Sequence, residues 1–313
     1  MIEGQEDVTW ADWVALAETC ERLGIEALFR SDHYLSVAGD HSRGSLDAWA
    51  TINALAAVTT TLRLGALVSP ATFRHPSVFA KLVTTADHIS GGRVEAGLGA
   101  GWMEAEHRAY GFPFPSLRDR MDAYAEQLEI VHRSFEPGPF SFRGKHFTVE
   151  DLDALPKPVQ QPHPNFIVGG SAGPRGAALG ARWADEYNFA FASPGEAADK
   201  RRAIHAACRD AGRDPATMTV SLMTGVVLGA DREEVDRRVG AVAALRGQEP
   251  EDLRAYGLEL AGNWIVGTPE EVVERLREYE AAGVERVFCQ HLAHWDLGMV
   301  ELLAGEVIPA FRS

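Results

Sequence analysis

Polar and glycine-rich motifs follow short apolar segments at several points, and these motifs are the residues best suited to bind a ligand or move a proton. Residues 31–34 (SDHY), 69–74 (SPATFR), 99–102 (GAGW) and 169–173 (GGSAG) occupy such positions. A histidine beside an aspartate can exchange a proton near neutral pH, and glycine lets a ligand approach the backbone closely. The residues alone leave a second interpretation open, in which the glycines only make turns and the histidine bonds to local backbone.

The motif at residues 169–173 is the candidate for binding an anion. It precedes a segment with helical spacing, and the free N–H groups and positive dipole at a helix N-terminus suit a phosphate. Arg175 would add positive charge. The residues predicted to contribute to this phosphate site are Gly169, Gly170, Ser171 and Gly173.

Alternating strands and helices must position these motifs. Residues 62–68 and 93–98 are apolar runs of strand length, and residues 76–90 between them have helical spacing, as parallel pairing requires. Seven strands are expected, near residues 25, 62, 93, 166, 185, 219 and 284. The eighth strand of a barrel has room only at Met1–Gln5. The fold expected is therefore an α/β (β/α)8 TIM barrel whose first strand is short or clipped, or whose true start lies upstream.

Residues 1–313 are expected to form one barrel domain with two insertions. Residues 136–165 are rich in proline and lack a clear period, which marks an excursion from the core and a candidate lid over a site. Residues 231–261 are charged and helical, and they are expected to be external. Ligands bind at the C-terminal ends of the strands in such barrels. We therefore expect the motifs to meet there, with residues 34–45 and 136–165 as walls of the pocket.

Composition narrows the class of protein. The chain has 313 residues, 46% of them hydrophobic, and a formal net charge of −15. An acidic chain is a poor general binder of nucleic acid or anionic membranes. No apolar run approaches the roughly 18 residues of a membrane span. The N-terminus shows no signal-peptide pattern. The separated cysteines Cys20, Cys208 and Cys289 are expected to be structural. We expect a cytoplasmic protein with a small-molecule substrate.

Several motifs, in this order, resemble the bacterial luciferase-like monooxygenase superfamily, and within it the branch that uses the deazaflavin coenzyme F420. They are IEGQEDVTW, LFRSDHY, LGALVSPATFRHP, DHISGGRVEAGLGAGWMEAEHRAYGFPFP, PKPVQQPHP, VGGS and VGTPEEVVERLREYEAAGVERV, and they span residues 2–288. The resemblance implies an eight-stranded barrel that binds the cofactor at the C-terminal ends of its strands. It also implies an oxidoreductase that transfers hydride between F420 and a small organic substrate, as a homodimer or larger oligomer.

The resemblance implies roles for particular residues. His33, as the catalytic residue, would lie beside the deazaflavin ring, where it could donate a hydrogen bond or shuttle a proton, and Asp32 could fix its tautomer. A non-prolyl cis peptide is implied at about Ala66-Leu67, where it would support the ring system. His107 and Tyr110 would touch the cofactor tail, or else form an exposed helix face. The other residues expected at the cofactor are Ser69, Gly99, Gly101 and Trp102, with the glycine-rich motif at 169–173.

Two positions depart from the sugar-phosphate dehydrogenases of this superfamily. Those enzymes have an acidic residue at the position of Trp102 and a tryptophan at the position of Val37. Their mechanism is therefore not carried over to this chain. The nearby acids, Glu104 and Glu106, are interpreted as solvated charges at the start of a helix.

No metal site is expected, because His291 and His294 lack an evident third ligand. Glu3 and Gln5, after the first strand, could line the pocket. With F420 no oxygen is needed. The alternatives that remain are an FMN-dependent monooxygenase, which would need a reductase partner, and a non-catalytic member that binds a flavin or nothing.

Overall fold

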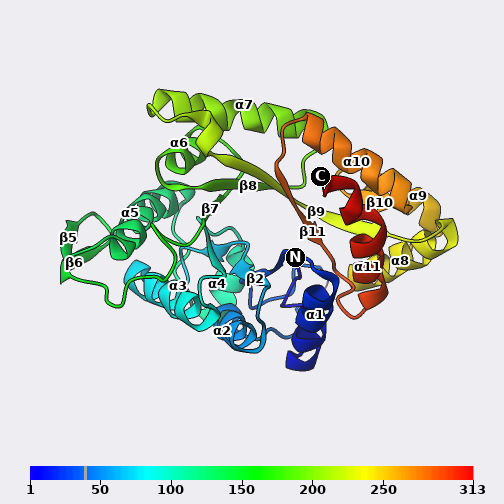
Figure 1. Cartoon of the computed structure of the whole chain (residues 1–313), viewed down its shortest axis with the longest axis horizontal. Coiled ribbons are helices and arrows are strands. Elements are labelled where there is room, and N and C mark those ends of the chain that lie inside the picture. The colour runs from blue at the N-terminus through cyan, green and yellow to red at the C-terminus, as the bar shows by residue number, and fades with distance from the viewer. Residues whose placement is uncertain (39–40, 313) are drawn as a thin grey trace.

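Seven parallel strands form a curled sheet with helices on its outside (Figure 1). The computed structural model describes residues 1–38 and 41–312, so residues 39–40 of the predicted pocket wall lie outside the described residues. The strands, in spatial order, are β1 (Ala27–Arg30), β2 (Arg63–Ala66), β4 (Val94–Gly99), β7 (Phe166–Gly169), β8 (Glu186–Ala190), β9 (Thr219–Leu228) and β11 (Arg286–Gln290). All seven lie where the apolar runs predict them.

Four further strands complete the sheets. β3 (Ser69–Pro70) pairs with the end of β4, and β10 (Ile265–Gly267) pairs with the C-terminal end of β9. β5 (Phe140–Arg143) and β6 (Thr148–Leu152) form a separate antiparallel hairpin.

The helices follow the strands in the alternation expected from the sequence. They are α1 (Trp10–Leu23), α2 (Ala48–Val58), α3 (Pro76–Ser90), α4 (Glu104–Tyr110), α5 (Leu117–Phe135), α6 (Pro174–Trp183), α7 (Pro194–Asp210), α8 (Arg232–Leu245), α9 (Leu253–Leu260), α10 (Pro269–Ala281) and α11 (Leu297–Leu302). Local signals begin several of them. The predicted capping boxes are present at Thr9 with Asp12 and at Thr268 with Glu271.

Met1 and Ile2 connect the two ends of the curled sheet. Ile2 pairs with Arg30 in parallel, and the N–H of Ile2 donates to Phe29 O over 2.9 Å. On the other side, the amino group of Met1 donates to Cys289 O over 2.9 Å. The first strand expected at residues 1–5 is thus reduced to a two-residue connection. The α/β barrel fold predicted from the sequence, with a short first strand, is confirmed.

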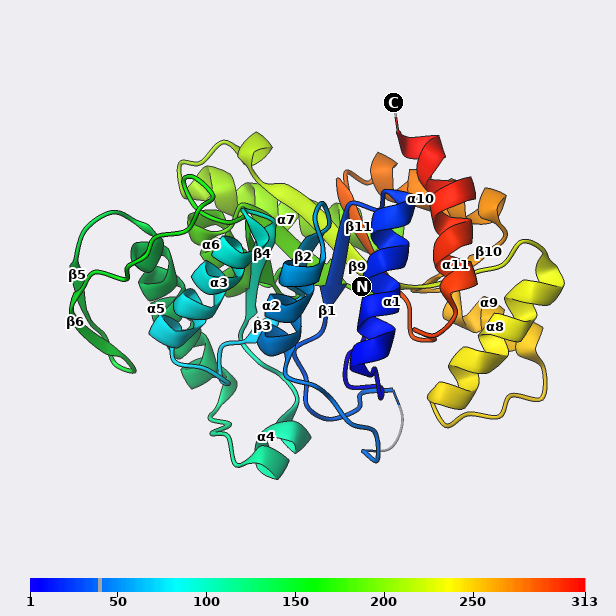
Figure 2. The ribbon, with the colours of Figure 1, turned by 60° about the horizontal axis from the view of Figure 1, so that its bottom comes forward.

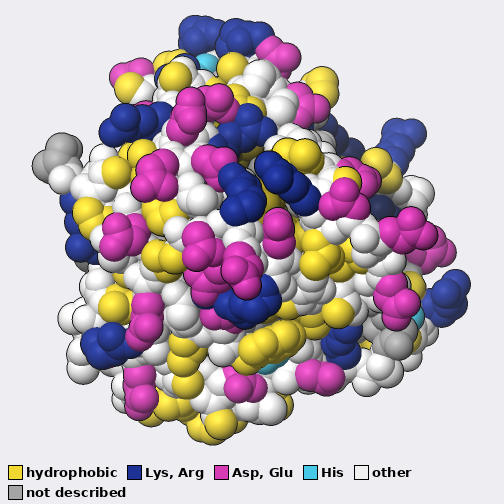
Figure 3. Space-filling model, turned by 90° about the vertical axis from the view of Figure 1, so that its right-hand side faces the viewer, with side chains coloured by type: hydrophobic (Ala, Val, Ile, Leu, Met, Phe, Trp, Pro, Cys, Tyr) yellow, Lys and Arg dark blue, Asp and Glu magenta, His cyan; other side chains and the backbone are white. Residues whose placement is uncertain are grey.

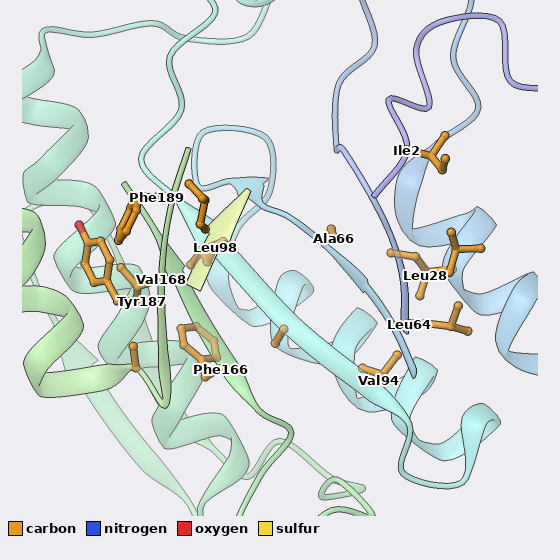
Figure 4. Packing of buried hydrophobic residues seen from close by; sticks show 14 of the residues in the cluster. Ile2, Leu28, Leu64, Ala66, Val94, Leu98, Phe166, Val168, Tyr187 and Phe189 are labelled. Carbon is orange, nitrogen blue, oxygen red and sulfur yellow. The ribbon is translucent and has the colours of Figure 1, made fainter. Parts of the chain in front are cut away.

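A continuous apolar core lies between the sheet and the helices. Leu28, Leu64 and Val94 lie next to one another on successive strands, as Figure 4 shows, and each is at most 4% exposed. They belong to the same buried cluster as Trp13 and Val83 of the surrounding helices. A smaller cluster of Phe29, Leu67, Ile167 and Phe288 forms separately from this core.

Charged side chains meet where the strands begin, and we call this group the floor cluster: Arg63, Glu95, Glu186 and Arg286. Glu95 accepts from Arg63 Nε over 2.6 Å and from Arg286 Nη1 over 2.7 Å. The same Arg286 nitrogen lies 3.1 Å from Glu186. These residues are the first or second of β2, β4, β8 and β11, so the floor cluster fills the N-terminal end of the barrel.

The prediction that residues 136–165 form a lid over the site is wrong. The β5–β6 hairpin lies outside the helix layer, beside α5 (Figure 1). Its turn is fixed there because Glu126 of α5 accepts the N–H groups of Lys145, His146 and Phe147. The segment that follows bonds to α3, through Lys81 and other residues. The insertion at 231–261 is helical as predicted, and it forms α8 and α9.

Of the helices in the described part of the chain, none is long and apolar enough to cross a membrane. Acidic and basic side chains are interspersed on the face shown in Figure 3.

Candidate active site

The loops that follow β1, β2 and β4 lie at one end of the barrel, together with α4 (Figure 2). This is the C-terminal end of the strands, opposite the floor cluster. The arrangement brings together the predicted site residues of the first half of the chain. Their individual roles stay predictions, and their contacts differ in several respects from those expected.

His33 and Glu106 form the central contact of this end. His33 Nδ1 lies 2.8 Å from Glu106 Oε2, and the Glu106 side chain has no exposed surface. The other oxygen of Glu106 accepts the N–H groups of Tyr34 and of Leu35, the latter over 3.1 Å. An ionised carboxylate only accepts hydrogen bonds, so Nδ1 of His33 donates to Glu106, and Nε2 of His33 is left for another partner. The interpretation of Glu106 as a solvated charge is therefore wrong, while Glu104 is exposed as expected.

The electrostatics of this pair follow from burial and from the mutual contact. Burial acts to lower the pKa of His33, but the hydrogen bond and charge of Glu106 outweigh it and raise the pKa above the ordinary 6.5. Burial acts to raise the pKa of Glu106, and His33 with the two backbone N–H groups lowers it instead. The pair thus favours a protonated His33 beside an ionised Glu106.

Asp32 does not fix the tautomer of His33, so that prediction is wrong. Its carboxylate accepts from Ser69 Oγ over 2.6 Å and from both terminal nitrogens of Arg74. Arg74 also lies 3.1 Å from Asp47 at the start of α2. Trp49 donates to Ser69 Oγ over 2.9 Å. Asp32 and Ser69 therefore connect the loop after β1 to the loop after β2, and they are 1% exposed or less.

Trp102 and Tyr110 supply aromatic surface near His33. The Trp102 ring meets His33 edge to face with centroids 5.6 Å apart, and 67% of Trp102 is exposed. Tyr110 is half exposed and stacks on Tyr34, with centroids 5.0 Å apart. An exposed aromatic wall beside a histidine suits a planar or apolar ligand.

His107 is buried inside the loops, so neither expectation for it, a tail contact or an exposed helix face, is met. It is 1% exposed, and Nδ1 lies 2.7 Å from Met103 O. A carbonyl only accepts, so Nδ1 is the donor. Nε2 lies 2.6 Å from Thr72 Oγ1. His107 therefore connects α4 to the loop after β2.

A non-prolyl cis peptide lies beside this site, one residue later than expected, at Leu67-Val68 rather than Ala66-Leu67. Ala66 is fully buried and Leu67 is 7% exposed. The neighbouring glycines are required by packing. A Cβ on Gly99 or on Gly169 would lie 2.8 Å or 2.7 Å from a methyl group of Val68. Gly101 has φ +80°, which favours glycine, and faces Thr72.

The motif at 169–173 joins the end of β7 to α6 as predicted. Gly170 and Ser171 are exposed, and the N-cap Gly173 provides no side-chain cap for the helix. Lys200 of α7 donates to Ser171 O over 2.9 Å. The exposed backbone, the uncapped helix and the lysine form a suitable cradle for a phosphate. Arg175 does not contribute, because it pairs with Asp122 of α5.

Polar residues after the first strand form a buried network. Glu3 accepts from Gln5 Nε2 over 2.6 Å and also from Gln290 Nε2. Gln5 in turn accepts from Ser31 Oγ. Glu3 and Gln5 are at most 5% exposed, so they lie beneath the loops and do not form an open wall.

The histidines after β11 do not form a metal centre. His291 Nε2 lies 3.0 Å from Asp296 O, and burial lowers the pKa of His291 to about 4. In the described part of the chain, the one group with the spacing of metal ligands is Asp119, Asp122 and His146, at the surface. Lys145 lies 2.7 Å from Asp119 and 3.3 Å from Asp122, so a cation already neutralises these carboxylates.

The chain is similar in sequence to known enzymes over nearly its whole length. The chain is 26% identical to the FMNH(2)-dependent dimethylsulfone monooxygenase of Pseudomonas putida, over 95% of this chain and 86% of that protein. It is 24% identical to the F420-dependent glucose-6-phosphate dehydrogenase of Amycolatopsis mediterranei, over 96% and 95%.

Solved structures of the same fold cover the whole chain. An F420-dependent secondary alcohol dehydrogenase, in complex with an F420-acetone adduct, superposes with a TM-score of 0.81 at 22% identity, over 98% of this chain and 96% of that one. The sequence of residues 2–286 matches the family described as luciferase-like monooxygenase. The chain therefore belongs to the luciferase-like monooxygenase family, whose members among its relatives include both flavin-dependent and F420-dependent enzymes.

Proposed function

We propose that the protein is an F420-dependent oxidoreductase that reduces a small organic substrate, with His33 as the proton donor. The observation that supports this most is the buried contact between Glu106 and His33 Nδ1. Bound F420 would supply the hydride. The protein would then have to supply a proton at the substrate atom that gains negative charge, and a protonated imidazole beside a carboxylate is suited to that task.

The residues at this end fit such a cofactor. Trp102 and Tyr110 offer aromatic surface for a ring system, and the exposed backbone of Ser171 with Lys200 offers donors for a phosphate. The cis peptide at Leu67-Val68 lies in the short connection between β2 and β3. Asp32 and His107, which are buried, would orient the loops without touching the cofactor.

FMN is the second candidate, and it is favoured by the relative from Pseudomonas putida, whose name specifies FMNH(2). In that case the protein would be a monooxygenase and would need a reductase partner. A non-catalytic role is less consistent with the site. A buried carboxylate is costly unless it is paired. Glu106 already accepts the N–H groups of Tyr34 and Leu35, so holding the loop does not require a further contact with a titratable histidine.

Two binding titrations of the purified protein, one with F420 and one with FMN, test the proposal by fluorescence. The expected result is tight binding of F420 and no detectable binding of FMN. Tight binding of FMN alone would move the assignment to a monooxygenase, and binding of neither would return it to a non-catalytic member. We further propose that the active form is a homodimer or larger, which sedimentation would test.

A further inference from the structure

The C-terminal end of the barrel, which we call the mouth, is only half used by the proposed cofactor site. His33, the cis peptide, Trp102 and the glycine-rich motif follow β1, β2, β4 and β7. The other half of the mouth is formed by the ends of β8, β9 and β11, with β10 beside β9. A substrate that exchanges hydride with a cofactor in the first half would place its remaining atoms in the second half.

Met223 shows which side of β9 faces the inside of the barrel. It packs with the smaller apolar cluster, whose members come from β1, β7 and β11 and from the residue after β2. Those strands lie on different sides of the barrel, so the cluster fills its interior. Gly225 is two residues further along the strand and therefore faces the interior as well. Leu222 and Val226 face the other way and pack against the helices.

Trp264 fills the space in front of Gly225. A Cβ on Gly225 would collide with the Trp264 ring. Gly225 lies opposite Gln290, the last residue of β11, so the ring lies at the mouth. Arg246, at the end of α8, covers another part of the ring, 5.9 Å from its centroid. Figure 2 shows α8 on one side of the mouth and α4, which carries Glu106, on the other.

Phe191 extends this wall and is its exposed part. It directly follows β8, and its ring is stacked beside that of Trp264, with centroids 6.4 Å apart and planes 22° apart. The φ of Phe191 is +50°, which a bulky side chain rarely adopts. Its N–H donates to Met223 O over 3.0 Å, which fixes it there. Strained backbone of this kind is concentrated at ligand sites.

Polar side chains inside this half of the barrel are engaged with one another. Asn188 Nδ2 donates to Ser221 Oγ over 3.0 Å. Gln290 donates to Glu3. The surface offered to a ligand is therefore mainly the pair of stacked rings, and such a surface suits a flat apolar group.

We propose that Phe191 and Trp264 form the substrate side of the active site, and that the substrate carries a flat apolar group, such as an aryl ring, that packs against Phe191. The proposal rests on the proposed function in calling this ligand the substrate. The surface itself does not depend on which cofactor binds in the first half of the mouth.

Calorimetric titration with acetophenone, a flat apolar ketone, tests the surface. The titration uses the full chain, both alone and after saturation with whichever of F420 and FMN binds. Acetone, which lacks the ring, is the comparison ligand. Saturable binding of acetophenone is expected in at least one of the two states, with acetone about tenfold weaker. Absence of saturable acetophenone binding in both states would overturn the proposal.

Phe191→Ala should weaken the binding of acetophenone by about tenfold, and Phe191→Tyr, which keeps the ring, should keep the affinity within about twofold. Phe191→Gly suits the left-handed φ and should give the same loss if the alanine variant does not fold. Phe311→Ala is the matched control. Phe311 is 38% exposed, against 40% for Phe191, and it lies near the C-terminus, which Figure 2 shows at the opposite end of the barrel.

The variants also separate this proposal from the proposed function. Unchanged acetophenone affinity in Phe191→Ala and Phe191→Gly, or equal weakening by Phe311→Ala, would overturn the substrate surface. A matching loss of cofactor affinity in Phe191→Ala would also overturn it, because Phe191 would then belong to the cofactor site. If F420 does not bind but acetophenone binding still depends on Phe191, the proposed function fails and the apolar surface stands.

Discussion

The two ends of the barrel both bury charge, but they neutralise it differently. In the floor cluster, the carboxylates of Glu95 and Glu186 face Arg63 and Arg286. Arginine stays protonated at any physiological pH, so the charges there are fixed. At the other end, the buried carboxylate of Glu106 faces His33, whose charge can change near neutral pH. A fixed pair suits structure, and a titratable pair suits proton transfer.

The largest effect on stability is expected at the floor cluster. Glu95→Gln leaves the partly buried Arg63 and Arg286 with less opposite charge, and the free energy of unfolding should fall by about 3 kcal/mol. Thermal or denaturant unfolding measures this loss. Activity per folded molecule should stay unchanged, because the floor lies opposite the site. A large loss of turnover in the folded fraction would mean that the two ends are not independent.

Acid should weaken the same interaction. Burial opposes ionisation of Glu95, but the contacts with Arg286 and Arg63 lower its pKa below the ordinary 4.5. Its contribution to stability is therefore complete above pH 4.5 and is lost as the pH falls through the lower folded pKa. The difference in stability between the wild-type chain and Glu95→Gln should shrink over that range. A constant difference down to acid unfolding would contradict this.

A different pattern is expected for His33→Ala. Turnover per folded molecule should fall by more than tenfold, because the proton donor is lost. The thermal midpoint should fall as well, because the buried carboxylate of Glu106 loses one of its partners. Steady-state kinetics with the cofactor identified by titration measures the effect. Unchanged turnover would remove the catalytic role of His33. His107→Ala serves as the comparison, because it should act through folding of the loops.

A smaller effect is expected at the motif of residues 169–173. A side chain at Gly170 would lie 2.9 Å from Tyr187 Oη and would displace the exposed backbone. Gly170→Val should weaken the binding of cofactor by about tenfold, as measured by fluorescence titration. Gly195→Val, at a glycine with open space around it, is the matched control. Equal affinity of both variants would exclude this motif from the phosphate site.

The subtlest change is expected for Glu106→Gln, which keeps the shape of the side chain. Glu106 raises the pKa of His33, so its loss should lower that pKa. The proton-donating form would then disappear at lower pH. The alkaline limb of the pH–rate profile should therefore move to lower pH, and Glu106→Asp should restore part of the shift. A profile that does not move would mean that Glu106 only orders the loop.

The sequence was sufficient for the fold because the strands are continuous apolar runs and the helices carry local start and stop signals. It was insufficient for the site because its contacts are long-range. Glu104 and Glu106 share the first turn of α4, and no local signal separates the exposed from the buried one. Burial of Glu106 depends on Tyr34 and Leu35, which are more than seventy residues away. Likewise Asp32 bonds to Arg74 and not to its neighbour His33.

The position of Val68 has a consequence for how this sequence can change over evolution. Its methyl groups leave no space for a Cβ on Gly99 or Gly169, which come from two adjacent strands. A mutation at either glycine is therefore tolerated only after Val68 becomes smaller. The three positions are therefore expected to change together.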